Sequence, residues 1–309
     1  MHLLLAIAPA VRIHAGLVDE PGLSAGLESD PLRATPLRER LRTALIEDQS
    51  ARLLFTHFRL LLRVVRNELR ARYAGSILGV GWSIVTPLLI LGIYSTVYLY
   101  IFQIHDMAGL SGTRYVMFIF SGLVPFLATG EALSLGVASI LADKALLTNT
   151  VFPVDLAPVK PVVTSQVVMG TGMTVLLAGV ALNGGLHWTV VLLPLLWGAH
   201  VLALTGLNWI LSLLNVVFRD LQNLIGAILM ILLVASPITY TPAMVPAQLQ
   251  GLVVFNPFAY YVIGYQKLIV LGELPTLSQT VTIAAISIVL FVAGSWFFPR
   301  ARRVLIDYA

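Results

Sequence analysis

The chain of 309 residues contains no cysteine, and only 11% of its residues are charged. The absence of cysteine excludes disulfide bonds and thiolate metal sites. Soluble globular domains carry about 25% charged residues. A chain that is 58% apolar, with a mean hydropathy of +0.90, is therefore predicted to be a polytopic membrane protein.

The sequence also lacks the motifs of several enzyme classes. It has no G-x-x-x-x-G-K-[ST] P-loop, so it cannot hydrolyse ATP through such a loop. HExxH and Asp-x-Asp are absent too, and the six histidines are scattered; His200 is interpreted as a hydrogen-bonded packing residue. We predict no catalytic residue and no metal. Nucleic acid is not an expected partner, because no basic patch is interleaved with exposed aromatics outside the first helix.

A basic stretch precedes the first long apolar run. Its arginines recur at spacings of 7, 4, 3 and 4 residues: Arg52, Arg59, Arg63, Arg66 and Arg70. At about 100° per residue they form one stripe of a helix. The opposite side is apolar: Leu54, Phe58, Leu61, Val65 and Leu69. This pattern predicts a membrane-surface helix with its apolar face in the acyl boundary and its arginines towards phosphates and water. A generic amphipathic helix beside a membrane anchor is the alternative.

Six apolar runs follow, each near the roughly 20 residues needed to span a bilayer. They cover residues 82–102, 115–141, 158–182, 188–213, 223–242 and 277–298. Of the 19 lysines and arginines, 17 fall on one side of these spans, and only Arg114 and Lys267 fall on the other. The positive-inside rule then places both termini in the cytoplasm.

The chain is predicted to divide into four parts. Residues 1–50 are interpreted as a cytoplasmic tail, with a cleaved signal peptide as the alternative. Residues 51–81 form the interface helix and a Leu-Gly loop, residues 82–298 the six-helix domain, and residues 299–309 a cytoplasmic tail. Within the domain, the Pro-punctuated but apolar segment 241–276 predicts two short helices in the outer leaflet. The fold class is thus an all-α polytopic membrane protein with an amphipathic interface helix, six transmembrane helices and two re-entrant half-helices.

Glu131 is the only charge deep in a predicted span. An intramembrane carboxylate is a functional candidate by default. Because no second intramembrane acid or base could form a relay with it, we interpret it as a neutral, hydrogen-bonded packing residue. This interpretation also weakens the case for a proton-coupled carrier.

Several ordered motifs resemble the membrane subunits of type-2 ABC exporters of O-antigen, capsular polysaccharide or teichoic acid. A basic helix leads to Leu78-Gly79, and Trp82 precedes Pro87 by five residues. The further motifs are SGLVPF at 121–126, LLTNTVFPVDLAPV at 146–159, LNVVFRDLQNL at 214–224, SPITYTPAMVP at 236–246 and NPFAYYVIGYQKLIVLGELP at 256–275. The resemblance covers about residues 52–305.

The resemblance implies a homodimer in the bacterial inner membrane, with two copies of a separate cytoplasmic ATPase that holds ATP and Mg. The exported substrate would be an undecaprenyl-linked polysaccharide, as in lipopolysaccharide or capsule biosynthesis. Membrane lipids would meet the headgroup-level set Arg59, Arg63, Arg66, Arg70, Leu78 and Gly79. The ATPase would meet a coupling set, Arg72, Leu146, Asn149, Phe152, Pro153 and Asp155, and the cytoplasmic loop holds Arg219 and Asp220. No cofactor is expected on this chain.

Aromatic rings on the first span are candidates for the channel lining, because sugars present apolar ring faces that stack on aromatic side chains. Trp82, Tyr94, Tyr98 and Phe102 lie within about one face of the helix. Packing or interfacial anchoring is the alternative role for these rings. For the whole chain, the rival functions are a type-2 ABC exporter of small lipids or drugs, and an integral-membrane enzyme of glycan assembly.

Overall fold

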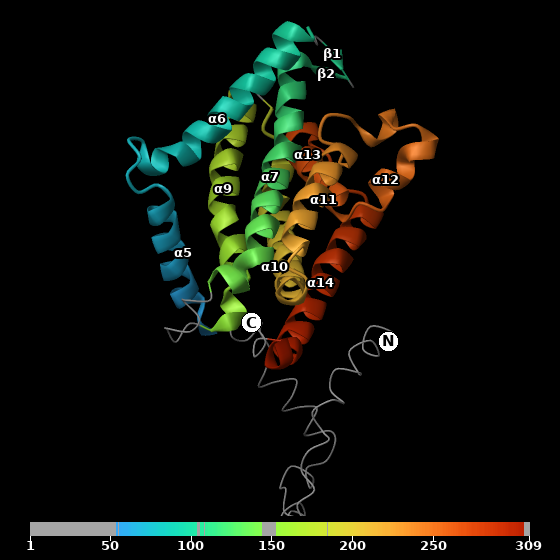
Figure 1. Cartoon of the computed structure of the whole chain (residues 1–309). Helices are drawn as coiled ribbons and strands as arrows, with labels where there is room; N and C mark the ends of the chain where they lie inside the picture. The colour runs from blue at the N-terminus through green and yellow to red at the C-terminus, as the bar shows by residue number, and fades with distance from the viewer. Residues whose placement is uncertain are drawn as a thin grey trace, which may run out of the picture. The chain divides into compact units, whose positions relative to one another are not determined.

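The computed structural model describes residues 54, 56–103, 106–107, 109–143, 153–183 and 185–305. The structure is almost entirely helical, which confirms the predicted all-α class (Figure 1). The longer helices are α5 (Phe58–Arg72), α6 (Trp82–Ser95), α7 (Gly112–Ala142), α9 (Val159–Leu182), α10 (Leu193–Val217), α11 (Leu221–Ala235), α13 (Pro257–Gln266) and α14 (Leu277–Leu305).

Shorter elements connect these helices. The 3₁₀ turns are η3 (Gly79–Gly81), η5 (Val154–Leu156), η6 (Trp188–Leu192), η7 (Pro242–Met244) and η8 (Ala247–Leu249). Two π-helical segments extend α6 and α13: η4 (Thr96–Ile101) and η9 (Lys267–Leu271). A small antiparallel hairpin, β1 (Asp106–Met107) with β2 (Leu110–Ser111), precedes α7 and was not predicted. The remaining helix, α12 (Gln250–Val254), has one and a half turns.

Helix α7 is the centre of the bundle. It is the most buried of the long apolar helices, and α9, α10, α11 and α13 all pack on it (Figure 1). Glycines allow the close approaches: a Cβ on Gly136 would lie 2.1 Å from Asn208 Nδ2, and one on Gly122 would lie 2.9 Å from Val262. Small residues at helix crossings are typical of membrane bundles, where association depends on close packing.

Helices α10 and α14 also cross closely. A Cβ on Gly206 would lie 2.1 Å from the carbonyl oxygen of Leu290, and one on Gly294 would lie 2.3 Å from the carbonyl oxygen of Gly206. The two backbones therefore touch at a glycine-to-glycine crossing. Either glycine replaced by a larger residue would force α14 away from α10.

Five of the six predicted spans form helices long and apolar enough to cross a membrane within the described part of the chain. The fifth predicted span, residues 223–242, is the exception. Its helix ends earlier than residue 242, so the predicted end is wrong. Helix α11 ends at Ala235 after 15 residues, or about 22 Å. Ser236 is extended, as expected for a residue before a proline, and Pro237 cannot continue the helical hydrogen bonds.

The two helices predicted for residues 241–276 are present as α12 and α13. Asn256 caps α13 by accepting from the Phe258 N–H at 2.9 Å, and it donates to Ser236 Oγ at 2.8 Å. Gln266, at the far end of α13, donates to the carbonyl oxygens of Pro237 and Ile238. These bonds join the motifs that begin at Ser236 and Asn256, and they hold the irregular backbone inside the bundle.

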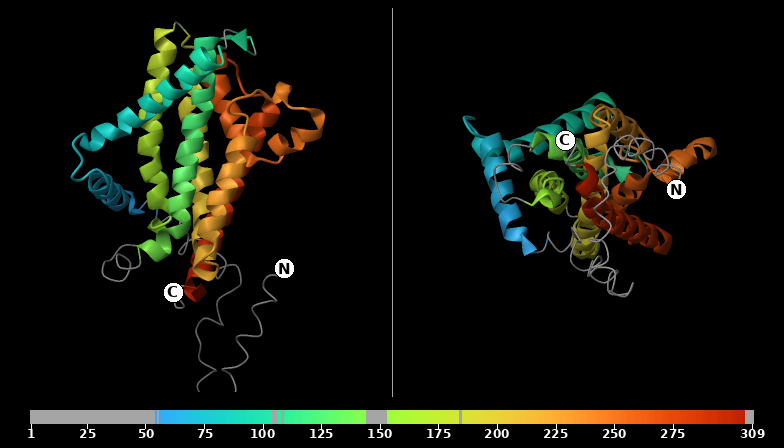
Figure 2. Two further views of the ribbon diagram at one scale, coloured as in Figure 1. Left: turned by 45° about the horizontal axis from the view of Figure 1, so that its top comes forward. Right: turned by 60° about the horizontal axis from the view of Figure 1, so that its bottom comes forward.

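Helix α5 packs beside α9 (Figure 2). Leu61 and Val65 are buried in a cluster with Leu156, Trp209 and Phe298. The prediction that the apolar face of this helix lies in lipid is therefore wrong for its central residues, which are covered by protein. The sequence pattern cannot distinguish a protein surface from an acyl chain, because both are apolar partners.

Candidate functional site

The candidate site begins at the turn between α5 and α6, where the Leu-Gly loop was predicted. Gly75 and Gly79 have φ angles of +77° and +51°, a backbone region that favours glycine. Trp82 Nε1 donates to Ser76 Oγ at 2.9 Å, which closes the turn, and Leu78 is exposed. The arginines assigned to the headgroup level are all exposed: Arg59, Arg63, Arg66 and Arg70. Their role at lipid headgroups stays a prediction.

A lysine joins three segments at the start of α9. Lys160 Nζ lies 2.7 and 2.8 Å from the two carboxylate oxygens of Asp143, at the end of α7, and 3.4 Å from Glu68 on α5. The Lys160 side chain is only 11% exposed and that of Asp143 is 17% exposed. Because both groups are largely shielded from water, removing either one would leave a shielded charge without its partner, which is more costly than at a surface pair.

A second ion pair joins α5 to α7. Arg72 Nη1 donates to Glu131 Oε1. Burial, the largest single influence, lowers the pKa of Arg72, but the hydrogen bond and negative charge of Glu131, together with Tyr73 and Glu68, outweigh it and the pKa is raised. Glu131 is therefore paired with a cation from another helix, and not simply packed as a lone neutral acid. Arg72 serves this contact and its predicted role at the ATPase stays a prediction.

The predicted aromatic face is present at the end of α6. The rings of Tyr94 and Tyr98 stack with centroids 5.9 Å apart, and Tyr98 and Phe102 follow at 5.6 Å. Tyr98 also meets Tyr115 of α7 edge-on at 5.7 Å. Tyr115 in turn stacks on Phe118 at 6.3 Å. We call Tyr94, Tyr98, Phe102, Tyr115 and Phe118 the aromatic ladder.

Exposure differs along this ladder. Tyr94 and Tyr98 are half-buried against the main apolar core, Phe102 is 62% exposed, and Tyr115 is buried. Trp82 lies at the other end of α6, in the turn described above, and no ring contact joins it to the ladder within the described residues. Both the channel-lining role and the packing alternative are compatible with rings that have one covered and one open face.

Only part of the predicted ATPase-coupling set lies in the described chain. Leu146, Asn149 and Phe152 lie outside the described residues. Pro153 begins the turn η5, and Asp155 within it is fully buried beneath Trp209, whose Nε1 donates to the Asp155 carbonyl oxygen at 2.9 Å. This bond ties the backbone of the turn to α10. Between α10 and α11, Arg219 and Asp220 are exposed.

His200 is a structural residue in a buried network. Its Nε2 lies 2.9 Å from Thr129 Oγ1, its Nδ1 lies 3.4 Å from the Tyr265 hydroxyl, and its ring stacks on Tyr261. Both ring nitrogens thus have a protein partner, as the packing interpretation predicted.

In the described chain, no three His, Cys, Asp or Glu side chains are grouped in a way that could hold a metal ion.

Neither the residues that bind α5 to the bundle nor the second half of the aromatic ladder were predicted from the sequence. Glu68 is the only acidic residue of α5. A lone carboxylate indicates an ion pair, but Arg72 of the same helix, four residues later, is an equally good partner, so the pattern does not point to Lys160. No comparable local signal marks Tyr115, because its contact with Tyr98 depends on how two helices cross.

The sequence of this chain is similar to known membrane transport proteins. Residues 59–270 match the family model described as ABC-2 type transporter. The chain is 29% identical over 253 residues to the O-antigen export system permease protein RfbA of Myxococcus xanthus, covering 81% of this chain and 95% of that protein. Two proteins of that name from Klebsiella pneumoniae are 26% and 27% identical, each across 70% of this chain and 82% of its own length. Since the family model covers more than half of the residues, this chain belongs to the ABC-2 type transporter family.

Proposed function

We propose that this chain is the permease subunit of an ATP-driven exporter that moves an O-antigen-type, lipid-linked polysaccharide across the bacterial inner membrane. The observation that carries the proposal is the match to three O-antigen export permeases over most of both chains. A helical bundle with at least five candidate spans supports it. ATP hydrolysis occurs on a separate subunit, since this sequence contains no P-loop motif.

The functional unit is a homodimer that carries two copies of the ATPase. Apolar side chains on α11 support this assembly, because Met230, Ile231 and Val234 are 74%, 67% and 77% exposed in the single chain. Helix α6 is likewise little covered by the rest of its own chain. A second copy related by two-fold symmetry would cover such surfaces and provide the second wall of a path between the two bundles.

Loss of surface polysaccharide tests the proposal. Deleting the gene in its host should abolish the surface glycan and lead to accumulation of the lipid-linked polymer in the cytoplasmic leaflet. Expression of this chain with its ATPase should restore export, whereas the same chain with an ATPase lacking its P-loop lysine should not. A deletion strain with normal surface glycan and impaired export of a small lipid or drug would contradict the proposal.

Both termini are proposed to be cytoplasmic, from the charge asymmetry of the sequence. Single cysteines can be introduced without background labelling, because the chain has none. A membrane-impermeant maleimide added outside should label cysteines at Ser111 and Gln248, and should miss cysteines at Asn149 and Asp220. Labelling at Asn149 from outside would reverse the assigned orientation.

The aromatic ladder is proposed to contact the glycan as it advances. Tyr94→Ala together with Tyr98→Ala should slow polymer export several-fold, because the stacked faces that replace water around the sugar rings are removed. Tyr100→Ala is the matched control: Tyr100 lies in the same π-helical segment as Tyr98, but it is 76% exposed, and its ring is not paired with a ladder ring among the described residues. Export rate in proteoliposomes is the measurement, alongside dimer yield and ATPase binding. Unchanged export, or export lost only with folded protein, would assign these tyrosines to packing.

A further inference from the structure

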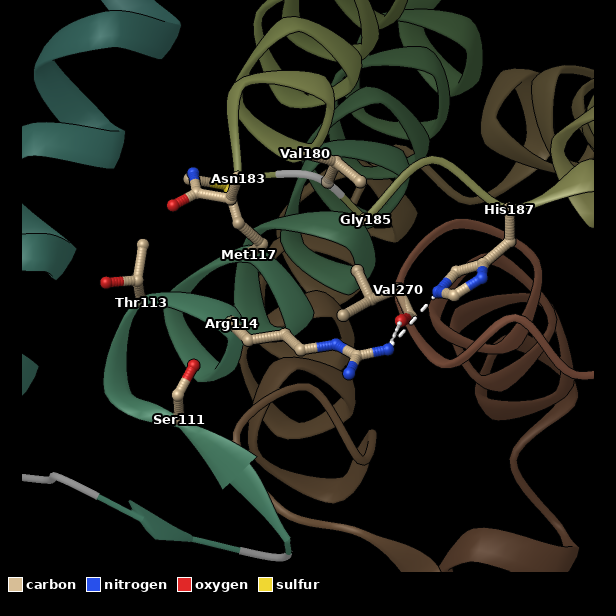
Figure 3. Close-up of a pocket in the computed structure, with 9 residues that line it drawn as sticks. All are labelled: Ser111, Thr113, Arg114, Met117, Val180, Asn183, Gly185, His187 and Val270. Atoms are coloured by element: carbon tan, nitrogen blue, oxygen red, sulfur yellow. Dashed lines mark hydrogen bonds between the residues drawn. The ribbon is translucent and has the colours of Figure 1, made fainter.

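A polar pocket of about 270 Å³ lies at the end of the bundle where α7 begins and α9 ends (Figure 3). We call it the α7–α9 pocket. Its lining comes from three separate segments: Ser111, Thr113, Arg114 and Met117 at the start of α7; Val180, Asn183, Gly185 and His187 at and after the end of α9; and Val270 of η9. This end carries Arg114 and Lys267, the two cations that the charge pattern assigns to the outer face.

Arg114 is held in a fixed position in this pocket. Its Nη2 donates to the Val270 carbonyl oxygen at 2.9 Å and lies 3.2 Å from His187 Nε2, as Figure 3 shows. The His187 ring is itself fixed against Gly272, where a Cβ would lie 2.6 Å from the ring. Gly272 has a φ of +72°, so glycine is favoured there for its backbone as well.

The guanidinium retains donors for another group. Arginine has five N–H donors, and the contacts above use only Nη2. Within the described chain, Nη1 and Nε have no hydrogen-bond partner. A guanidinium with free donors on two nitrogens matches the oxygens of a carboxylate or phosphate better than it matches a neutral hydroxyl.

The other polar groups of the α7–α9 pocket favour an anion as well. Ser111 and Thr113 provide hydroxyl groups. Asn183 provides an amide, whose Nδ2 donates one hydrogen bond to the Gly179 carbonyl oxygen at 2.7 Å. No acidic residue is among the described residues that line the pocket. With one fixed cation and no carboxylate, the pocket has a positive charge to be neutralised.

The surroundings of the pocket indicate a lipid. Leu182, Leu186 and Trp188, next to it along the chain, are 89%, 53% and 67% exposed. Exposed leucines suit acyl chains, and tryptophan is enriched at the membrane–water interface. A phosphate just above acyl chains is the arrangement of a glycerophospholipid. A soluble sugar would not require an apolar surface beside its binding site.

We propose that the α7–α9 pocket binds the phosphate of an anionic glycerophospholipid in the outer leaflet, with Arg114 as its principal ligand. Thr113 and Asn183 add hydrogen bonds to the headgroup, and Leu182 and Leu186 contact the acyl chains. Lipid bound here would brace the start of α7 against η9. The proposal goes beyond polysaccharide export. It rests on one part of the proposed function, the orientation that places this end of the bundle at the outer leaflet.

Lipid binding to the full-length permease, purified with its ATPase in detergent, tests this directly. Native mass spectrometry would follow titrations with phosphatidylglycerol and with phosphatidylcholine of the same acyl chains. The wild type should bind one phosphatidylglycerol at least tenfold more tightly than phosphatidylcholine. Arg114→Gln should abolish that preference. Lys267→Gln removes the same charge at the same end but does not line the pocket, so it should keep the preference.

A second variant separates binding from the structural bond between Arg114 and Val270. Thr113→Val leaves that bond intact and should weaken phosphatidylglycerol binding two- to threefold, with an unchanged unfolding temperature in lipid-free detergent. Equal binding of the two lipids to the wild type, or an unchanged preference in Arg114→Gln, would overturn the proposal.

Competition identifies the source of the anion. Undecaprenyl phosphate and methyl glucuronide should fail to displace phosphatidylglycerol when added at equal concentration. Displacement by undecaprenyl phosphate would assign the pocket to the lipid carrier, and displacement by the glucuronide would assign it to an acidic sugar. Either result would overturn the phospholipid assignment, and neither depends on whether the exported polymer is an O-antigen.

Discussion

Replacing Lys160 with methionine is expected to lower the free energy of unfolding by about 2–3 kcal/mol. Removing one partner of a shielded ion pair leaves the other charge unpaired, which costs about 3–5 kcal/mol when burial is complete and less when some water has access. Here the shielded partner is Asp143, and Glu68 loses its salt bridge to Lys160 as well. Denaturant unfolding in detergent micelles measures the change.

Two controls show whether the loss comes from the ion pair. Lys160→Met combined with Asp143→Asn removes both charges and should recover part of the stability. Lys267→Met removes a lysine whose partner, Glu273, is 3.8 Å away and 61% exposed, so its effect should be below about 0.5 kcal/mol. Equal losses from Lys160→Met and Lys267→Met would contradict the importance of the buried contact.

The same substitution should loosen α5. With Glu68 released, the contacts that still hold the helix within the described part of the chain are its apolar packing and the Arg72–Glu131 pair. Its exposed arginines should then be cleaved by trypsin faster than in the wild type. Unchanged cleavage together with lost stability would place the effect at the junction of α7 and α9 alone.

Phe152→Ala together with Pro153→Ala is expected to uncouple ATP hydrolysis from export. An apolar anchor at the centre of a protein interface typically contributes 2 kcal/mol or more, which is about a thirtyfold change in affinity. If these residues dock in the ATPase, the double variant should export at least tenfold less polymer while the ATPase remains active. Export and ATP hydrolysis measured together in proteoliposomes provide the comparison.

Leu274→Ala together with Pro275→Ala is the matched control for that experiment. It removes a large apolar residue and the following proline from an exposed connection at the opposite end of the bundle. Its export should equal that of the wild type. Wild-type export by the Phe152 and Pro153 double variant would exclude these residues from coupling.

The sequence by itself determined the class of the protein and most of its helices. Helices begin at Trp82 and Leu277 as the apolar runs predict, because hydropathy is a local property of consecutive residues. The interface helix was predictable too, since a periodicity of 3.6 residues needs no knowledge of the partner. The end of α11 could also have been read locally, because Ser236-Pro237 interrupts an otherwise continuous apolar run.

Tertiary structure alone decided what these elements contact. Glu131 is paired with Arg72, 59 residues away, and Tyr98 meets Tyr115 on a different helix. The apolar side of α5 faces α9, although the same side would have suited lipid equally well. The α7–α9 pocket combines three segments that are far apart in the chain. Such contacts depend on the packing of several helices at once, and no pattern within a single segment records them.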